Sequence, residues 1–171
     1  MPERLVLVGM MGAGKSTVGR LLAERLGRGF VDVDEEIVRL AGGSVADIFD
    51  GGERAFRDLE RQCLRGALDA DADVVVAAGG GAVLDADNRT RMRLAGTVVW
   101  LRAMPATLSE RVGDGSGRPL LENTDESGLA VLKRLSAERA ALYEEVADVV
   151  VDTDGLSTAE VADRVLALVT P

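Results

Sequence analysis

The sequence contains no histidine, and this absence excludes several classes of catalyst. Ser-His-Asp hydrolases, Cys-His nucleophiles, histidine-ligated zinc sites and phosphohistidine intermediates all require an imidazole. Any catalysis by this chain must therefore depend on Asp, Glu, Lys or Arg side chains, or on the backbone.

Cysteine and long apolar runs are also scarce. Cys63 is the single cysteine, so the chain can form no internal disulfide and no metal site with several cysteine ligands. That composition suits a reducing compartment. The first residues lack a basic segment followed by a long apolar stretch, and no apolar run reaches membrane-spanning length. We therefore expect a cytoplasmic protein without a membrane partner.

Aromatic residues make up only 3% of the 171 residues, and the formal net charge is -9. Nucleic-acid surfaces need cations for the phosphates and often aromatic rings for base stacking, so we expect no nucleic-acid partner. Of the 20 basic residues only Lys15 and Lys133 are lysines. Most of the arginines are explained as solvated surface residues, but a lysine in a motif stands out.

Five short apolar segments recur along the chain, with segments of helical periodicity between them. They cover residues 5–8, 30–33, 74–78, 97–101 and 149–151. Several are apolar at consecutive positions, which is typical of strands covered by helices on both faces. The pattern predicts an α/β fold of three layers around a parallel sheet, in a single domain over residues 1–171.

Helix starts and one irregular segment are also marked in the sequence. Capping-box spacing occurs at Ser44 with Asp47 and at Ser157 with Glu160, and Pro105 suits the first turn of a helix. Residues 113–124 combine several glycines and a proline with no periodicity, which is typical of a lid loop or of a disordered surface excursion.

A phosphate-binding motif follows the first predicted strand. Residues 9–17 read Gly-Met-Met-Gly-Ala-Gly-Lys-Ser-Thr, match G-x-x-x-x-G-K-[ST] and precede a helical pattern. Backbone N–H groups of such a turn converge on phosphate oxygens, and the helix dipole adds to their effect. An incidental glycine-rich turn is the weaker alternative. The motif predicts a nucleoside triphosphate site formed by Gly12, Ala13, Gly14, Lys15, Ser16 and Thr17.

Within this motif, Lys15 is expected to reach the β- and γ-phosphates, and the Ser16 hydroxyl to bind Mg²⁺. An aspartate at the end of a second core strand commonly assists the metal, but here residues 74–78 are followed by Gly79, Gly80 and Gly81. The carboxylate must therefore come from elsewhere.

Asp32 and Asp34 are the candidates for that carboxylate. They alternate with Val31 and Val33, so we expect both to project to one side at the end of a buried strand. Buried carboxylates are costly unless paired, and a metal and a substrate hydroxyl are suitable partners. The alternative, that Asp34 only caps the next helix, would explain Asp34 but not Asp32.

Other candidates are weaker when judged from the residues alone. Three consecutive glycines at 79–81 would let the backbone lie against a ligand, although a flexible turn is the simpler interpretation. Arg57 and Arg139 lie in helical segments, where an arginine is normally a surface residue. Spacing alone selects neither arginine as a site residue.

Taken together, the motifs resemble the shikimate kinase family over nearly the whole chain. Besides residues 9–17, the resemblance is carried by Asp-Val-Asp at 32–34, Ser-Val-Ala-Asp-Ile-Phe at 44–49, Phe-Arg-Asp-Leu-Glu at 56–60, Gly-Gly-Gly-Ala at 79–82, Arg-Pro-Leu-Leu at 118–121 and Arg-Ala-Ala-Leu-Tyr at 139–143. Many kinases share the first motif, but the combination is far more specific.

The resemblance implies transfer of the γ-phosphoryl group of ATP to the 3-hydroxyl of shikimate, a step towards chorismate and the aromatic amino acids. It also implies a P-loop fold with a five-stranded parallel sheet, like that of nucleoside monophosphate kinases. By position, the implied shikimate contacts are Asp34, Arg57, Gly80 and Arg139, with Gly79 and Gly81 beside them. The implied magnesium ligands are Ser16 and Asp32, and Arg111 lies near adenine.

Arg118 matches the arginine of the family's lid, and Pro119 is expected to keep the Arg118 backbone extended. Phosphoryl transfer needs mainly alignment and charge stabilisation, which makes Lys15, Asp34 and Arg118 the candidate catalytic residues. We expect a monomer. The alternatives are another small-metabolite kinase, such as a gluconate kinase, and a non-catalytic protein controlled by nucleotide binding.

Overall fold

The computed structural model describes residues 4–70 and 73–170, and its five strands form one parallel sheet, as predicted. The strands are β1 (Arg4–Val8), β2 (Gly29–Asp32), β3 (Val74–Ala77), β4 (Thr97–Arg102) and β5 (Val149–Asp152). Their order in the sheet is β2-β3-β1-β4-β5. Residues 1 and 171, the bounds of the predicted single domain, lie outside the described residues.

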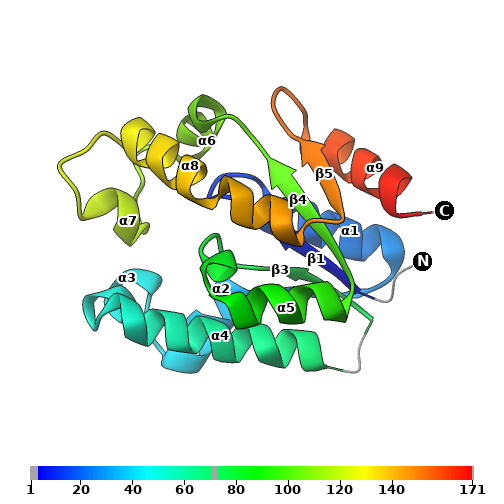
Figure 1. Ribbon diagram of the computed structural model, residues 1–171, viewed down its shortest axis with the longest axis horizontal. Coiled ribbons are helices and arrows are strands. Elements are labelled where there is room, and N and C mark those ends of the chain that lie inside the picture. Colours follow the sequence, from blue (N-terminus) through cyan, green and yellow to red (C-terminus); the bar gives the residue numbers. More distant parts are fainter. Residues whose placement is uncertain (1–3, 71–72, 171) are drawn as a thin grey trace.

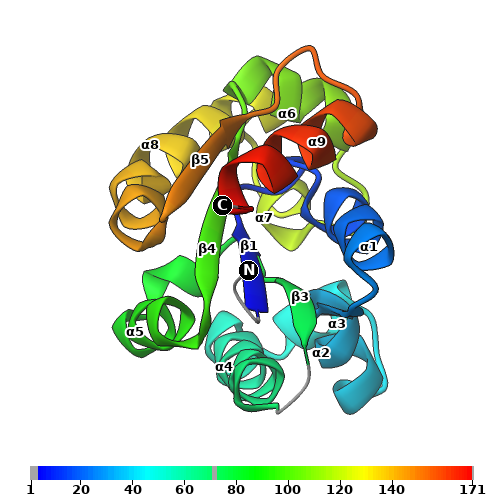
Figure 2. The same ribbon diagram turned by 90° about the vertical axis from the view of Figure 1, so that its right-hand side faces the viewer.

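Helices cover both faces of the sheet, which confirms the predicted three-layer α/β class. Helices α1 and α9 lie on one side, and α4, α5 and α8 lie on the other (Figure 2). The longer helices are α1 (Lys15–Leu26), α2 (Val33–Ala41), α4 (Glu53–Asp69), α5 (Ala86–Ala95), α8 (Gly128–Val146) and α9 (Thr158–Val169). The shorter ones are α3 (Val45–Asp50), α6 (Pro105–Val112), α7 (Pro119–Glu122) and the 3₁₀ turn η1 (Ala82–Leu84).

The central strands are buried on both faces, and this explains their unbroken apolar runs. Leu5 of β1 is in register with Val75 of β3 and with Thr97 of β4, so β1 lies in the middle of the sheet. Strand β1 is buried from Leu5 to Val8 and β3 over its whole length. Removal of this apolar surface from water is the main stabilising contribution to the fold.

Most helix starts agree with the sequence signals. Ser44 and Ser157 form complete capping boxes with Asp47 and Glu160, and Pro105 occupies the first turn of α6. One expectation is wrong: the strand with Asp32 and Asp34 does not continue to Asp34. Strand β2 ends at Asp32 and α2 begins at Val33, because the Asp32 side chain accepts the free N–H groups of the first helical turn.

The segment predicted as a lid, residues 113–124, is partly ordered into the short helix α7. Arg118 directly precedes this helix with φ −118° and ψ 93°, the extended backbone expected before a proline. Figure 1 shows α7 at the same end of the molecule as α3. None of the helices among residues 4–70 and 73–170 is long and apolar enough to cross a membrane.

Candidate active site

The phosphate-binding motif joins β1 to α1 at the carboxyl end of the central strand. Its glycines are required by geometry, since Gly14 has φ 95° and a Cβ at Gly9 would collide with the carbonyl oxygen of Leu101. The helix begins at Lys15, directly after the turn. The turn and the helix N-terminus therefore present backbone N–H groups at one place, as anion binding requires.

Lys15 lies across the turn, with its ammonium close to both candidate aspartates. Its Nζ donates to the carbonyl oxygens of Gly9 at 2.7 Å and Met10 at 3.0 Å. Burial lowers the pKa of this ammonium to about 8, although the charges of Asp34 and Asp32 oppose the shift. This partly buried cation beside the phosphate cradle is well placed to bind anionic oxygens.

Asp32 connects α1 with α2. Its Oδ2 accepts a hydrogen bond from the Ser16 hydroxyl, and its Oδ1 accepts from the backbone N–H groups of Asp34 at 3.0 Å and Glu35 at 3.3 Å. The alternative interpretation, in which Asp34 caps the helix, is therefore wrong, since Asp32 is the cap. Capping uses one oxygen of Asp32 and leaves the other directed at Ser16.

The Ser16 hydroxyl and the Asp32 carboxylate form a small set of oxygen donors. Across the described ranges 4–70 and 73–170 there is no cluster of three or more His, Cys, Asp or Glu side chains that could hold a metal. A divalent ion here would need further oxygens from phosphate or water. Mg²⁺ is usually bound in that way, through one or two protein oxygens and substrate phosphates, so the donor set fits it.

Two adjoining cavities meet beside Asp34. The first has a volume of about 530 Å³ and is lined by the phosphate-binding residues Lys15, Ser16 and Thr17 together with Asp32. The second has a volume of about 320 Å³ and lies between α4, α8 and α7. Four residues line both cavities: Met11, Asp34, Gly80 and Arg118.

Asp34 is therefore placed at the junction between the phosphate cradle and the second cavity. Burial raises the pKa of its carboxyl group, and the nearby Lys15 ammonium opposes the shift. The charges of Arg118 and Arg57 also act on this carboxylate, which can accept a hydrogen bond from a hydroxyl group of a ligand.

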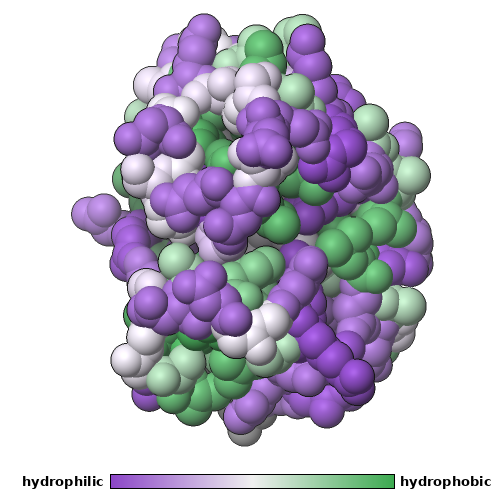
Figure 3. All heavy atoms as spheres, turned by 90° about the vertical axis from the view of Figure 1, so that its left-hand side faces the viewer, coloured by the Kyte–Doolittle hydropathy of each residue, from purple (hydrophilic) through white to green (hydrophobic). Residues whose placement is uncertain are grey.

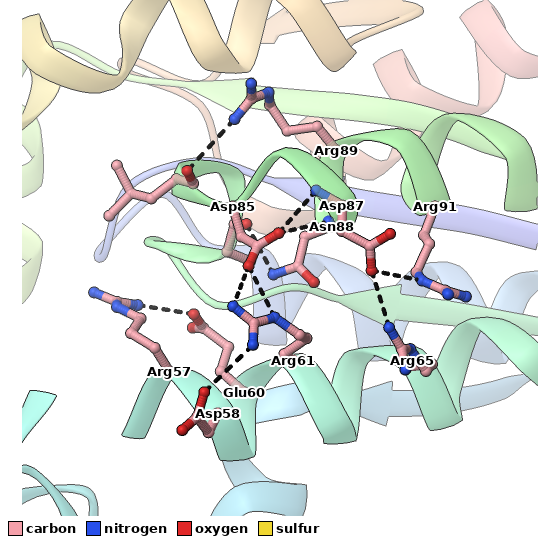
Figure 4. A network of polar contacts seen from close by, with 12 residues as sticks. Arg57, Asp58, Glu60, Arg61, Arg65, Asp85, Asp87, Asn88, Arg89 and Arg91 are labelled. Carbon is pink, nitrogen blue, oxygen red and sulfur yellow. Dashed lines mark hydrogen bonds and ion pairs between the residues drawn. The ribbon is translucent and has the colours of Figure 1, made fainter. Parts of the chain in front are cut away.

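The second cavity is lined by two arginines that sequence spacing alone would have left at the surface. Arg139 is buried and Arg57 is half-buried. Arg57 on α4 donates from Nη1 to Glu60 Oε1 at 2.8 Å (Figure 4). It also donates from Nη2 to Glu53 Oε1 at 3.4 Å. Arg139 on α8 is only 3% exposed and lines the same cavity.

Arg139 differs from Arg57 in its partners. Within residues 4–70 and 73–170 no carboxylate forms an ion pair with Arg139, and its buried Nε has no hydrogen-bond partner. Burial of an unpaired guanidinium is costly, and an anionic ligand in the cavity would offset this cost. The second cavity is therefore suited to a small acid.

Glu60 is a cavity residue that the sequence analysis missed. It is only 2% exposed, it holds Arg57, and burial raises the pKa of its carboxyl group while Arg57 opposes the shift. The signal was present in the sequence. Glu60 lies four residues after Phe56 and four before Leu64 on the apolar stripe of α4, where an unpaired carboxylate would be costly.

The glycines at 79–81 form a turn against which these charged groups pack. A Cβ at Gly79 would collide with the Glu60 carboxylate, and one at Gly81 with the Arg57 guanidinium. The missing side chains of Gly79 and Gly81 leave the space that the ends of the Glu60 and Arg57 side chains occupy. Gly80 and Gly81 line the second cavity, whereas Gly79 and Ala13, both predicted site residues, line neither cavity.

The two remaining predicted residues also lie near the site. Arg118 of the lid borders both cavities. Arg111 on α6 donates to the Gly12 carbonyl at 3.3 Å and to the Thr153 carbonyl at 2.8 Å, at the edge of the first cavity. A contact between Arg111 and adenine stays a prediction.

The face that carries α3 and α7 has apolar side chains exposed between hydrophilic ones (Figure 3). The apolar side chains that line the second cavity include Val45, Phe49, Phe56 and Leu120. A cavity lined by apolar side chains and by two arginines suits a ligand that has both a carboxylate and a hydrocarbon ring.

The chain is similar to known proteins of one family over nearly its whole length. Residues 11–170 match the family model described as Shikimate kinase. The chain is 49% identical to the shikimate kinase of Streptomyces coelicolor over 164 residues, which is 95% of this chain and 92% of that protein. It is also 49% identical to the shikimate kinase of Xanthomonas campestris over 158 residues, covering 91% of this chain and 86% of that protein.

A solved structure is also similar over nearly the full length. The shikimate kinase from Acinetobacter baumannii in complex with shikimate superposes with a TM-score of 0.93 at 38% identity, and the match covers 97% of this chain and 92% of that one.

Proposed function

Because this chain belongs to the shikimate kinase family, we propose that it transfers the γ-phosphoryl group of ATP to the 3-hydroxyl of shikimate, giving shikimate 3-phosphate and ADP. The observation that carries the proposal is the junction of the two cavities. A phosphate cradle and an acid-binding cavity share Asp34 and Arg118, so a donor phosphate and an acceptor hydroxyl would meet there.

In this proposal the acid cavity binds the carboxylate of shikimate through Arg139 and Arg57. A planar guanidinium donates two parallel hydrogen bonds to a carboxylate, and Arg139 has no acidic partner among the described residues to compete with the ligand. The shikimate-bound relative from A. baumannii supports such an acceptor. Phe49 and Phe56 would pack against the ring.

Asp34 would orient the 3-hydroxyl and is placed to take its proton as the oxygen bonds to the γ-phosphorus and the bond to the β-phosphate oxygen breaks. The loose transition state of phosphoryl transfer does not require early proton removal. Lys15 would donate to the phosphates, and Arg118 would neutralise charge on the transferring group. Closure of residues 113–124 over the site would exclude water and so limit ATP hydrolysis.

Ser16 and Asp32 would hold Mg²⁺ together with phosphate oxygens and water. When bound, the ion neutralises phosphate charge and orients the triphosphate. The Ser16 to Asp32 hydrogen bond supports this assignment because it already brings the two donors together. The cytoplasmic location and the monomeric state stay predictions.

The alternatives fit the geometry less well. A gluconate kinase would share the phosphate cradle but would not need paired arginines around a rigid cyclic acid. A non-catalytic nucleotide-binding protein would need no acceptor cavity lined by Asp34, Arg57 and Arg139.

A coupled assay of ADP release with shikimate, quinate, gluconate and nucleoside monophosphates as acceptors tests the proposed function. We expect shikimate to give the highest kcat/KM, and ADP release without an acceptor to be slower by orders of magnitude. Faster turnover of gluconate or of a nucleotide would contradict the proposal, and so would ADP release that does not depend on shikimate.

A further inference from the structure

The glycine turn that forms one wall of the acid cavity is anchored from two directions. From α5, Asn88 Nδ2 donates to the Ala82 carbonyl at 3.1 Å and Arg89 Nη1 to the Val83 carbonyl at 2.9 Å (Figure 4). From α8, on another side of the cavity, the Tyr143 hydroxyl donates to the Gly80 carbonyl at 2.5 Å. Of these three anchors, Tyr143 holds the glycine that lines both cavities.

Gly80 lies between the phosphate-binding loop and Arg139. A Cβ at this position would lie 3.4 Å from the Met11 backbone nitrogen and 3.7 Å from Arg139 Nη1. The turn therefore packs against the phosphate-binding loop on one side and against the carboxylate-binding arginine on the other. A small displacement of Gly80 would change the space available between these groups.

Tyr143 is built into the fold as a rigid support. Its side chain is 1% exposed, and its ring stacks on Trp100 of β4 with ring centroids 5.5 Å apart. It lies four residues after Arg139, which is one turn further along the same face of α8. Burial raises the pKa of the hydroxyl to about 12, so it stays protonated and able to donate near neutral pH.

We propose that Tyr143 is a positioning residue for acid binding, which fixes Gly80 relative to Arg139 although Tyr143 itself does not line the acid cavity. One residue of α8, Arg139, would hold the ligand, and a second residue one turn away holds the glycine that packs against Arg139. The Tyr143 to Gly80 hydrogen bond thus fixes the position of the glycine turn beside Arg139. This inference rests on the proposed function.

The test compares Tyr143→Phe with the parent protein by calorimetric titration of shikimate and of ATP separately. The variant keeps the ring on Trp100 and removes only the hydroxyl donor. Loss of one neutral hydrogen bond predicts a Kd for shikimate raised about three- to tenfold. The Kd for ATP should change by less than about twofold, because residues 9–17 form the phosphate cradle and Gly80 only borders it.

Steady-state kinetics distinguish a specific effect on shikimate binding from a general loss of structural order. The KM for shikimate should rise in proportion to its Kd while kcat changes much less, since the lost interaction contributes to binding before and during transfer. Val146→Ala is the matched control, because Val146 is buried in the same helix and lines neither cavity. That variant should lose thermal stability but keep the parent affinity for shikimate.

Tyr143 is the single tyrosine, so incorporation of 3-fluorotyrosine labels this position alone and gives a second test if Tyr143→Phe does not fold. Its ¹⁹F resonance should shift on saturation with shikimate and shift less with ATP.

Three results would overturn the inference: unchanged shikimate affinity in Tyr143→Phe, an equal loss in Val146→Ala, or a ¹⁹F resonance that does not respond to shikimate. Failure of the parent protein to bind shikimate would instead refute the proposed function.

Discussion

Arg139 and Arg57 face the same cavity, but the structure predicts that replacing each by lysine has unequal consequences. Arg57 already shares its Nη1 with Glu60 at 2.8 Å. Arg139 is buried, and none of the described carboxylates forms an ion pair with it. Lysine keeps the charge at either position but loses the planar pair of donors.

The size of the effect follows from the number of charge-assisted hydrogen bonds lost. Each contributes about 1.5 to 3 kcal/mol, and about 1.4 kcal/mol corresponds to a tenfold change in affinity. Arg139→Lys should therefore weaken shikimate binding by about ten- to a hundredfold. Arg57→Lys should weaken shikimate binding less, by about tenfold or less, because some of the N–H donors of Arg57 bind Glu60 rather than the ligand.

Calorimetric titration of each variant with shikimate and with ATP in separate experiments is the appropriate assay. The affinity for ATP should stay near that of the parent, because residues 9–17 build the phosphate cradle. Thermal melts of both variants check that the fold is intact. Equal losses for ATP and shikimate, or no loss for either, would refute the assignment of these arginines to the acid site.

Three further predictions concern the phosphate cradle. Lys15→Met should lower kcat by orders of magnitude without unfolding the protein, whereas Lys133→Met, measured in the same assay, should retain parent activity. The kcat/KM for ATP should fall as pH rises through about 8. Lys15 binds phosphate as the ammonium, and burial lowers the pKa of this ammonium to about 8. A flat pH profile of kcat/KM from pH 7 to 10 would contradict this role of Lys15. Asp32→Asn should raise the Mg²⁺ concentration needed for half-maximal rate, and superimposable metal titrations of variant and parent would limit Asp32 to its capping role.

The fold and the phosphate site could be predicted from the sequence because both depend on local patterns. Consecutive apolar residues in β1 and β3 indicate that these strands are buried on both faces. The glycines and the lysine at 9–17 predict a phosphate-binding turn of fixed geometry. The boundary at Asp32 was harder to predict. A valine–aspartate alternation also fits a longer strand, and the capping hydrogen bonds that end β2 depend on backbone geometry.

The acid cavity could not be built from spacing alone. Arg57 and Arg139 are 82 residues apart on two helices, and only the packing of α4 and α8 around the glycine turn brings them to one cavity. Family resemblance identified both arginines. The difference in their acidic partners and the role of Glu60 depend on three-dimensional packing, which the sequence pattern does not show. The Tyr143 to Gly80 contact likewise joins residues from different parts of the chain.

A crystal structure of this protein with shikimate and a non-hydrolysable ATP analogue would test the central claim most directly. We expect the shikimate carboxylate to accept hydrogen bonds from Arg139 and Arg57, and the 3-hydroxyl to lie between Asp34 and the γ-phosphate. A carboxylate bound away from Arg139, or a 3-hydroxyl directed away from Asp34, would contradict the claim that transfer occurs where the two cavities meet.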